Sequence, residues 1–322
     1  MAVTGDRVNV RAASTTAVLV GLGALALGTL DARAAAADGP VADTEQPRRR
    51  DATWREIMRG PYHSSRLFAT PVADTVGPYI LAVSWDGSLL ENPGVLSSAG
   101  VVAIGFGDIA QLEYRHTSAI SLDEIAAPVP AVGVQLEAPL PDDPSWPAVA
   151  LAFRLGVPRT ETRGATTIEE TVTDLYLVAR QRLPGRLSTA TLHAGVRMSS
   201  AELALGGDAS GSARRRLFLP AGGVELAVGD HTVAITEVGR APSFDRDPGG
   251  APMIGAGVIG RLGVRWYLHP AFSFDASVGY QVDDATSPAG VRSVVDWDIR
   301  LGGELFVPWG AIACRTAALF CS

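Results

Sequence analysis

The sequence predicts an all-β protein: a closed, antiparallel, up-and-down transmembrane β-barrel of about twelve strands. Apolar and polar residues alternate along successive runs, which indicates strands with two unlike faces because successive Cβ atoms point to opposite sides of a sheet. The runs reach roughly ten residues, the length that a tilted strand needs to cross the hydrocarbon core of a bilayer. An export signal precedes them, and in lipid only closure of the sheet satisfies its edges.

The clearest alternation lies between Pro252 and Phe306, in runs over residues 263–269, 272–281 and 295–305. We expect the apolar set of each run to face outward and the charged set inward, and the same for Ala148–Leu155. In the last run the two faces are Val295, Trp297, Ile299, Leu301 and Leu305 against Asp296, Asp298, Arg300 and Glu304.

Ten earlier runs complete the candidate strands. No helical crossover separates them, so the meander must be antiparallel. Short links such as Gly229-Asp230 are typical of hairpin turns. The runs are Tyr79–Asp86, Val101–Phe106, Ile109–Thr117, Ala131–Glu137, Ala148–Leu155, Thr171–Gln181, Ala190–Met198, Leu217–Val228, His231–Val238 and Met253–Gly263.

The N-terminal part divides into two regions ahead of the barrel. Residues 1–37 are typical of a cleaved secretory signal peptide, with basic residues before an apolar core at Ala17–Leu30 and small residues at the end. Residues 38–65 form a flexible periplasmic leader. Within it, Asp51–Gly60 has the N-cap, apolar stripe and terminal glycine of a short helix. That helix either docks at the barrel mouth or belongs to the periplasmic tail.

The barrel is predicted over residues 66–308 and a C-terminal tail over residues 309–322. Strand pairing should stop near Pro308, because proline cannot donate to a ladder. The tail carries Cys314 and Cys321, which in one continuous helix would lie about 10 Å apart, too far for a disulfide. An oxidised pair therefore requires the tail to bend back, whereas free thiols permit a helix or an added strand.

Composition excludes several function classes. The net charge is −7 and the pI is about 5.3, which argues against a nucleic-acid partner because such proteins need a basic surface. The sequence has no lysine, and we attribute its arginine content to compositional bias. It also has no glycine-rich phosphate loop and no spacing typical of metal ligands, so we expect no cofactor and no metal.

Charged residues of both signs recur on the polar faces, and these are the candidate lumen-lining residues. In a narrow lumen such charges pair into a network, whereas in a wider one they line water and tune selectivity. We favour pairing. The candidates are Arg115, Arg154, Asp174, Arg180, His193, Arg197, Arg265, Asp275, Asp296, Asp298, Arg300 and Glu304, with Glu225 on the same kind of face.

Two short fragments have the spacing of catalytic groups. His116-Thr117-Ser118 resembles the His-x-Ser pair of outer-membrane lipid A deacylases, in which a base activates a hydroxyl. His116 shares its face with Leu112 and Tyr114, however, which favours a place at the membrane interface. Asp296-Trp297-Asp298 resembles the paired carboxylates of outer-membrane acid proteases, but ion pairing with Arg300 on the same face explains it better.

The late run Arg261–Pro270, followed by Phe274–Tyr280, resembles the late hairpin of bacterial porin-like outer-membrane β-barrels, and so does Ala69–Asp74 ahead of the first strand. The resemblance implies an outer-membrane location, contact with outer-membrane lipid and assembly by the barrel-folding machinery. The chain departs from this group at its end. Such barrels usually finish on an aromatic residue, whereas here Phe306 is followed by residues 307–322.

Three functions are compatible with these observations. The leading hypothesis is a passive pore or channel for a small-molecule solute. The alternative is a plugged barrel with a structural or binding role and no transport, and the third is a lipid-modifying enzyme of the outer membrane. Strand number fixes the lumen diameter only loosely, so the sequence does not choose between the first two.

Overall fold

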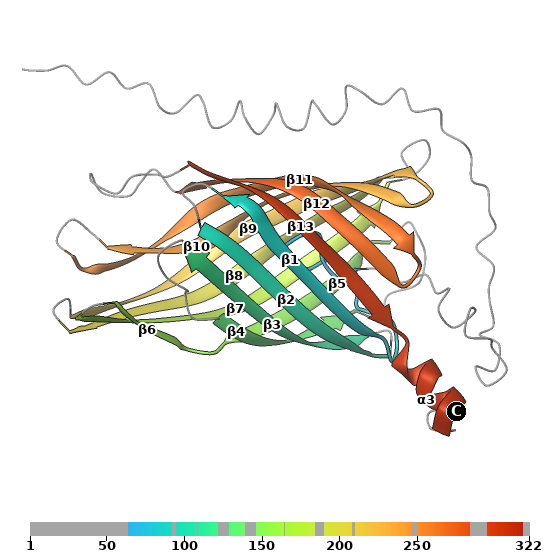
Figure 1. Ribbon diagram of the computed structural model, residues 1–322, viewed down its shortest axis with the longest axis horizontal. Helices are drawn as coiled ribbons and strands as arrows, with labels where there is room; N and C mark the ends of the chain where they lie inside the picture. Colours follow the sequence, from blue (N-terminus) through green and yellow to red (C-terminus); the bar gives the residue numbers. More distant parts are fainter. Residues whose placement is uncertain are drawn as a thin grey trace, which may run out of the picture. The chain divides into compact units, whose positions relative to one another are not determined.

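The computed structural model describes residues 64–91, 95–107, 109–121, 129–138, 146–163, 165–183, 190–207, 210–246, 250–283 and 295–317 (Figure 1). The predicted signal peptide, the predicted short helix at 51–60 and the tail from residue 318 onward lie outside the described residues. Those predictions, and the region boundaries drawn from them, stay predictions.

All the described strands belong to one antiparallel sheet that closes on itself. Each strand pairs with its neighbours in sequence, β1 pairs with β13, and β5 pairs with β7. The predicted closed meander is therefore confirmed. The strands are β1 (Leu81–Glu91), β2 (Val95–Phe106), β3 (Ala110–Ser121), β4 (Val129–Glu137), β5 (Ala148–Gly156), β6 (Arg159–Arg163), β7 (Thr166–Arg182), β8 (Ala190–Gly207), β9 (Gly211–Gly229), β10 (Thr232–Arg246), β11 (Pro252–His269), β12 (Phe272–Asp283) and β13 (Val295–Val307).

β5 and β6 together occupy one position in the barrel wall. Both pair with β7, with Leu155 opposite Thr173 and Arg159 opposite Glu170. Between them lies Pro158, which has no N–H to give to the ladder and so interrupts the strand. The described part of the chain thus forms a closed barrel of 12 strands, in agreement with the number predicted from the sequence.

β11 corrects one of the predicted strand boundaries. The sequence separated Met253–Gly263 from the run over 263–269, but the structure has a single strand of 18 residues over Pro252–His269. Gly263 does not break it. A Cβ at this position would collide with the backbone oxygen of Ala276 on β12, so the glycine lets the two strands approach closely.

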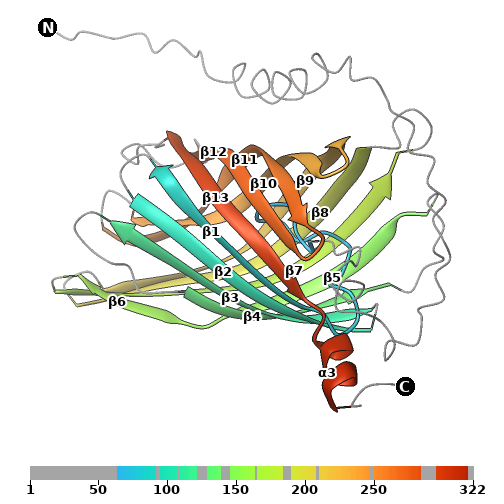
Figure 2. The same cartoon turned by 45° about the vertical axis from the view of Figure 1, so that its right-hand side comes forward.

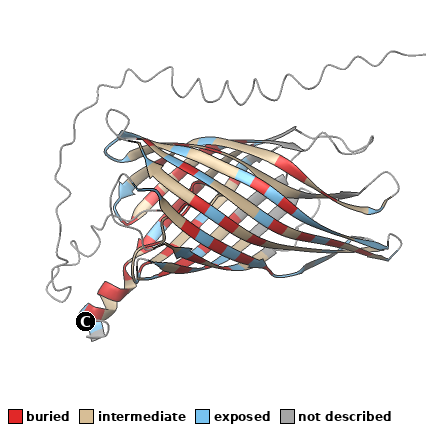
Figure 3. Ribbon diagram, turned by 180° about the vertical axis from the view of Figure 1, so that it is seen from behind, coloured by how far each residue is buried: buried red, intermediate tan, exposed pale blue. Residues whose placement is uncertain are grey.

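Across most of the barrel, apolar side chains cover the outer surface and polar side chains fill the interior. Along β5, exposed and buried residues alternate strictly from Leu151 to Gly156, and Figure 3 shows the same alternation around the wall. Since water normally drives the opposite arrangement, this outer surface is built for an apolar environment. Exposed outer residues include Val102, Leu112, Tyr114, Val132, Leu151, Phe153, Leu177, Met198, Leu262, Val278, Tyr280, Trp297 and Leu305.

At the end farthest from α3 (Trp309–Ala317), the long strands β7 to β11 reverse this arrangement. On β8, Glu202 points outward while Leu203 and Leu205 are buried inside. On β9, Leu217 and Leu219 join them in one buried apolar cluster that extends to β11. A polar outside and an apolar inside are what a water-exposed sheet requires, so this end of the barrel is built to stand outside a bilayer.

The C-terminal segment turns away from the wall where the sequence predicts. β13 ends at Val307, Pro308 follows, and α3 begins at Trp309. The helix rests on Tyr79, because the Trp309 ring meets the Tyr79 ring edge-on at 5.4 Å and the Gly310 N–H donates to the Tyr79 carbonyl at 3.2 Å. Cys314 is disulfide-bonded, and Cys321 lies outside the described residues.

No helix among the described residues is long and apolar enough to cross a membrane.

Candidate functional site: the occupied lumen

Residues Ser64–Pro78, which we call the lumen segment, lie inside the ring of strands and form no part of the wall (Figure 2). The segment contains a tight hairpin, in which the Leu67 N–H donates to the Thr70 carbonyl at 3.0 Å and the Val72 N–H to the Ser65 carbonyl at 3.0 Å. Its sequence has no alternation and carries Pro71 and the Gly77-Pro78 pair, which favour turns over ladder pairing. The chain enters the wall beyond Tyr79, whose φ is 55°.

Apolar side chains anchor the lumen segment to the wall. Leu67 and Ala73 are 0% exposed and Val76 is 1% exposed. Leu67, Phe68 and Val72 form a buried cluster with Ile235 of β10. Burying a Leu, Val or Phe side chain contributes about 1.5–3 kcal/mol, so the docked position is strongly favoured before any hydrogen bond is counted.

Glu237 of β10 holds the tip of the hairpin. Its carboxylate accepts hydrogen bonds from the backbone N–H groups of Phe68 at 2.9 Å, Ala69 at 3.0 Å and Thr70 at 2.8 Å, and from the Thr70 hydroxyl. Three successive N–H groups that converge on one oxyanion form a backbone nest. A buried carboxylate without a cationic partner is costly, and this nest is what stabilises the Glu237 charge.

Arg265 of β11 holds the hairpin from the other side. The side chain is 1% exposed and forms a two-pronged ion pair with Asp275 of β12, at 2.8 and 3.1 Å. Its remaining N–H groups donate to the carbonyls of Arg66 at 3.2 Å and Leu67 at 2.7 Å. One wall arginine therefore satisfies a wall carboxylate and two backbone carbonyls of the lumen segment.

The leg that leads from the hairpin to β1 is held by side chains of β3 and β4. The Val76 N–H donates to Gln111 Oε1 at 2.9 Å. Gln135 Nε2 donates to the carbonyls of Val72 at 2.9 Å and Asp74 at 3.1 Å. Both glutamines are 1% exposed, and buried amides of this kind are retained in structures when they are fully hydrogen-bonded.

Two wall glycines leave room for the lumen segment. A Cβ at Gly105 of β2 would collide with the carbonyl oxygens of Val76 and Gly77, and one at Gly223 of β9 would collide with the Leu67 side chain. The segment therefore packs directly against the backbone of the wall at these points.

The predicted lumen-lining residues of β5, β7 and β8 point inward and pair with one another. Arg154 binds Glu113 of β3. Arg197 forms a two-pronged pair with Asp174 at 2.8 Å, and both arginines lie over the ring of Tyr176, at 4.9 and 5.5 Å from its centre. Two further candidates form separate pairs. His193 Nε2 lies 3.1 Å from a Glu225 carboxylate oxygen, and Arg180 lies 2.6 Å from an Asp74 oxygen on the lumen segment.

A second group of charges lies where β13 meets β1 and β11. Arg300 pairs with Asp298 on its own strand and with Asp86 of β1, whose Oδ1 lies 2.8 Å from Arg300 Nη1. Arg261 binds Asp298 from the other side at 2.9 Å. Asp86 also lies 3.6 Å from Arg66 of the lumen segment. The structure thus joins Asp298 and Arg300 as the sequence indicates, and adds partners from distant strands.

Three predicted lumen-lining residues, Arg115, Glu304 and Asp296, are in none of these pairs. Arg115 forms no hydrogen bond or ion pair within the described residues, and Glu304, which is 3% exposed, keeps one carboxylate oxygen unbonded. The Asp296 side chain lies outside the described part of the structure.

The enzyme-like fragments gain no support. His116 lies on the same face of β3 as the exposed Leu112 and Tyr114, whereas the side chain of Ser118 is outside the described set. Asp298 is held by two arginines, as an ion-pair interpretation of the Asp-x-Asp fragment requires. Among the described residues, no group of three His, Cys, Asp or Glu side chains is placed to hold a metal ion.

Sequence reasoning missed four charged residues of the wall that now bear on the site: Asp86, Glu113, Glu237 and Arg261. It also missed Arg66 and Asp74 of the lumen segment. Glu113 alternates with Arg115, and Asp86 lies on the face opposite Trp85, so period two places both inside. Glu237 gave no such signal, because its partners are the backbone N–H groups of a segment 167 to 169 residues away.

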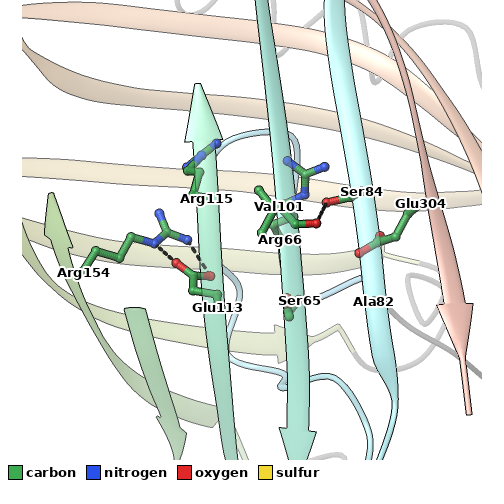
Figure 4. A pocket seen from close by; sticks show the side chains of 10 residues that line it. Ser65, Arg66, Ala82, Ser84, Val101, Glu113, Arg115, Arg154 and Glu304 are labelled. Atoms are coloured by element: carbon green, nitrogen blue, oxygen red, sulfur yellow. Dashed lines mark hydrogen bonds and ion pairs between the residues drawn. The ribbon is translucent and has the colours of Figure 1, made fainter. Parts of the chain in front are cut away.

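Two small cavities remain between the lumen segment and the wall. The first, of about 10 Å³, is lined by residues that include Arg66, Glu113, Arg115, Arg154 and Glu304 (Figure 4). The second, of about 90 Å³, lies beside the hairpin tip and is lined by Arg66, Phe68, Asp86, Arg115, Arg261, Asp275 and Arg300, among others. The lumen segment and the side chains around it thus occupy the part of the interior that lies between these two cavities and the wall.

Comparison with known proteins gives distant likenesses only. No protein-family model matches the sequence, and no curated protein is similar to it. Among solved structures, the chain is similar to the NanC porin, at 11% identity and a TM-score of 0.44, over 70% of this chain and 98% of that one. It is also similar to the KdgM porin, at 8% identity and a TM-score of 0.41, over 70% and 98% of the two chains.

The chain is likewise similar to the translocator domain of the autotransporter NalP from Neisseria meningitidis, at 14% identity and a TM-score of 0.38, over 70% of this chain and 87% of that one. The strand pairings of the chain itself establish its fold. They confirm the predicted porin-like barrel at the level of architecture: a closed antiparallel meander with an apolar outer surface.

Proposed function

We propose that the protein is an outer-membrane channel whose lumen is held closed by its own N-terminal lumen segment. The observation that carries the proposal is the nest of Phe68, Ala69 and Thr70 N–H groups on the Glu237 carboxylate. These bonds join the lumen segment to a wall side chain and take no part in the strand ladders, so the pairing of the wall does not depend on them. A segment held in this way can be released while the barrel stays intact.

The width of the barrel supports this proposal. Barrels of about eight strands are filled by their own side chains, whereas those with 16–18 strands leave an aqueous channel. A barrel of 12 strands is intermediate, so its interior takes either water or a further piece of chain. Here the lumen segment supplies that piece. The inward charges then pair with one another and with the segment, and they would line water once it left.

The two kinds of outer surface support a location in the outer membrane. The apolar surface fits a bilayer, and the reversed end of β7 to β11 fits the aqueous side. We propose that the end that carries α3 and the entry of the lumen segment faces the periplasm. The partners that we propose are outer-membrane lipid, the barrel-assembly machinery during biogenesis and a small-molecule solute. Phe306 is buried inside the barrel, so it is no outward-facing terminal aromatic.

Conductance in planar bilayers tests the proposal. We expect the wild-type chain to be mostly closed, and the Glu237→Gln variant to show frequent openings because two of the four hydrogen bonds that Glu237 accepts from the hairpin are lost. Glu202→Gln is the matched control, since Glu202 pairs with Arg214 on the outer face of β8 and β9. It should behave as the wild type does.

Two results would contradict the proposal in different ways. A steady open-state current from the wild-type protein would mean that the lumen segment does not close the barrel. A Glu237→Gln protein whose segment is undocked, yet which passes no current, would favour the plugged structural barrel.

A further inference from the structure

The cavity of about 90 Å³ beside the hairpin tip has the size of a small ligand site. It is bounded on one side by Arg66, Phe68 and Ala69 of the lumen segment and on the other by residues of β1, β2, β3, β11, β12 and β13. A single water needs only about 10–15 Å³ of such space. The cavity therefore holds more than one water or one small solute.

Arginine dominates the charge around this cavity. Arg66, Arg115, Arg261 and Arg300 line it, against Asp86 and Asp275. Both carboxylates already serve other groups: Asp86 is shared between Arg66 and Arg300, and Asp275 is held by Arg265. The carboxylates in the lining thus leave Arg115 without a counter-charge.

Neighbouring charged groups complete the surroundings of the cavity. Arg265 and Asp298 pair with residues of the lining, and Glu304 lines the adjoining smaller cavity. Glu237 accepts hydrogen bonds from the N–H groups of Phe68 and Ala69, which line the cavity. The guanidinium groups are then Arg66, Arg115, Arg261, Arg265 and Arg300, and the carboxylates are Asp86, Asp275, Asp298, Glu304 and Glu237. Cations and anions are then equal in number, but Asp86, Asp275, Asp298 and Glu237 are all held by other groups, so none of these four carboxylates bonds to Arg115.

Two buried donors near the cavity have no acceptor. The Nε atoms of Arg66 and Arg115 make no hydrogen bond, although Arg66 is only 7% exposed. In Figure 4 the Arg154–Glu113 pair is joined by dashed lines, whereas none connects Arg66 or Arg115 to the other side chains shown. Buried polar atoms nearly always have a partner, so the unsatisfied atoms indicate a missing acceptor at this place.

We propose that the 90 Å³ cavity binds one small monovalent anion, such as formate, acetate or a halide. The anion would accept hydrogen bonds from Arg115 of β3 and Arg66 of the lumen segment, and so bind the segment to the wall. Arginine suits this role, because its fork of N–H groups matches a carboxylate. This site depends on the occupied lumen alone and not on whether the barrel conducts.

Calorimetric titration of the full chain in detergent with sodium formate tests the site. Gluconate, a monovalent anion too large for the cavity, keeps the ionic strength constant. We expect saturable binding of one formate per chain and an affinity at least about tenfold lower in Arg115→Gln, which corresponds to about 1.4 kcal/mol. Arg180→Gln is the control. Arg180 also binds the lumen segment, through Asp74, but lies outside the cavity, so this variant should bind formate as the wild type does.

The same titration with sodium chloride and with sodium phosphate shows which class of anion the site binds. Binding of chloride with similar stoichiometry supports a monovalent-anion site, and tighter binding of phosphate than of formate would overturn the monovalent assignment. The proposal also fails if the heats of formate binding do not saturate, if Arg115→Gln binds formate with the wild-type affinity, or if Arg180→Gln weakens binding as much as Arg115→Gln does. Should Arg115→Gln not fold, Arg66→Gln takes its place with the same expected loss.

Discussion

Replacing Glu237 with glutamine should loosen the lumen segment without disturbing the wall. One carboxylate oxygen accepts from the Phe68 and Ala69 N–H groups and the other from Thr70. The glutamine side chain keeps one acceptor oxygen, but its NH₂ group takes the place of the other oxygen and faces the remaining N–H groups as a donor. Two charge-assisted hydrogen bonds are lost, each worth about 1.5–3 kcal/mol before relaxation. We therefore expect the free energy of docking to fall by about 2–4 kcal/mol.

Hydrogen exchange followed by mass spectrometry on peptides that cover residues 64–78 measures this change. Each 1.4 kcal/mol is a factor of ten, so the protection of these amides should fall by about 30-fold to 1,000-fold. Strands β11 and β12 should keep their protection, because the barrel ladder is untouched. The control is Glu202→Gln, a glutamate on the outer face of β8 that makes no contact with the segment. In this control variant the free energy of docking should change by no more than about 0.5 kcal/mol.

Unchanged protection of residues 64–78 in Glu237→Gln would refute this reasoning. It would mean that apolar burial of the segment alone determines docking, with the Glu237 nest contributing nothing. Loss of protection throughout the barrel would refute it differently, by showing that the segment and the wall fold as one unit.

Three other predictions follow from the same contacts. Arg265→Gln should lower the free energy of unfolding by about 3–5 kcal/mol, because Asp275 is left buried and unpaired. The double variant that also carries Asp275→Asn should regain part of this free energy, measured by thermal unfolding. Ile299→Arg, on the outer face, should cost roughly 2–4 kcal/mol near the bilayer midplane, whereas Arg300→Gln should alter lumen behaviour more than insertion. Reduction of the Cys314 disulfide should loosen α3, seen as stronger quenching of the helix tryptophan by iodide, while the barrel remains resistant to detergent.

Each of these fails on a definite result. The double variant could be no more stable than Arg265→Gln, which would show that Asp275 is not the source of the cost. The Ile299 and Arg300 variants could exchange their effects, which would reverse the assigned faces. Finally, reduction could leave tryptophan quenching unchanged, which would show that packing on Tyr79 alone holds the helix.

The sequence by itself determined the wall of this protein. Period-two alternation depends only on the geometry of neighbouring residues in a strand, so it assigns faces without knowledge of the partners. This is why Trp297 and Asp298 could be placed on opposite faces and why the strand number came out near its observed value. Pro308 marked the end of pairing for an equally local reason, since proline cannot donate to a ladder.

Only the tertiary structure decided what the wall encloses. The lumen segment has no periodicity that predicts burial, and its contacts with Glu237 and Arg265 span 167 to 199 residues of sequence. The partners of inward charges depend on closure and register, which bring Arg300 of the last strand against Asp86 of the first. Long-range contacts of this kind follow from the closed sheet, and a local pattern cannot encode them.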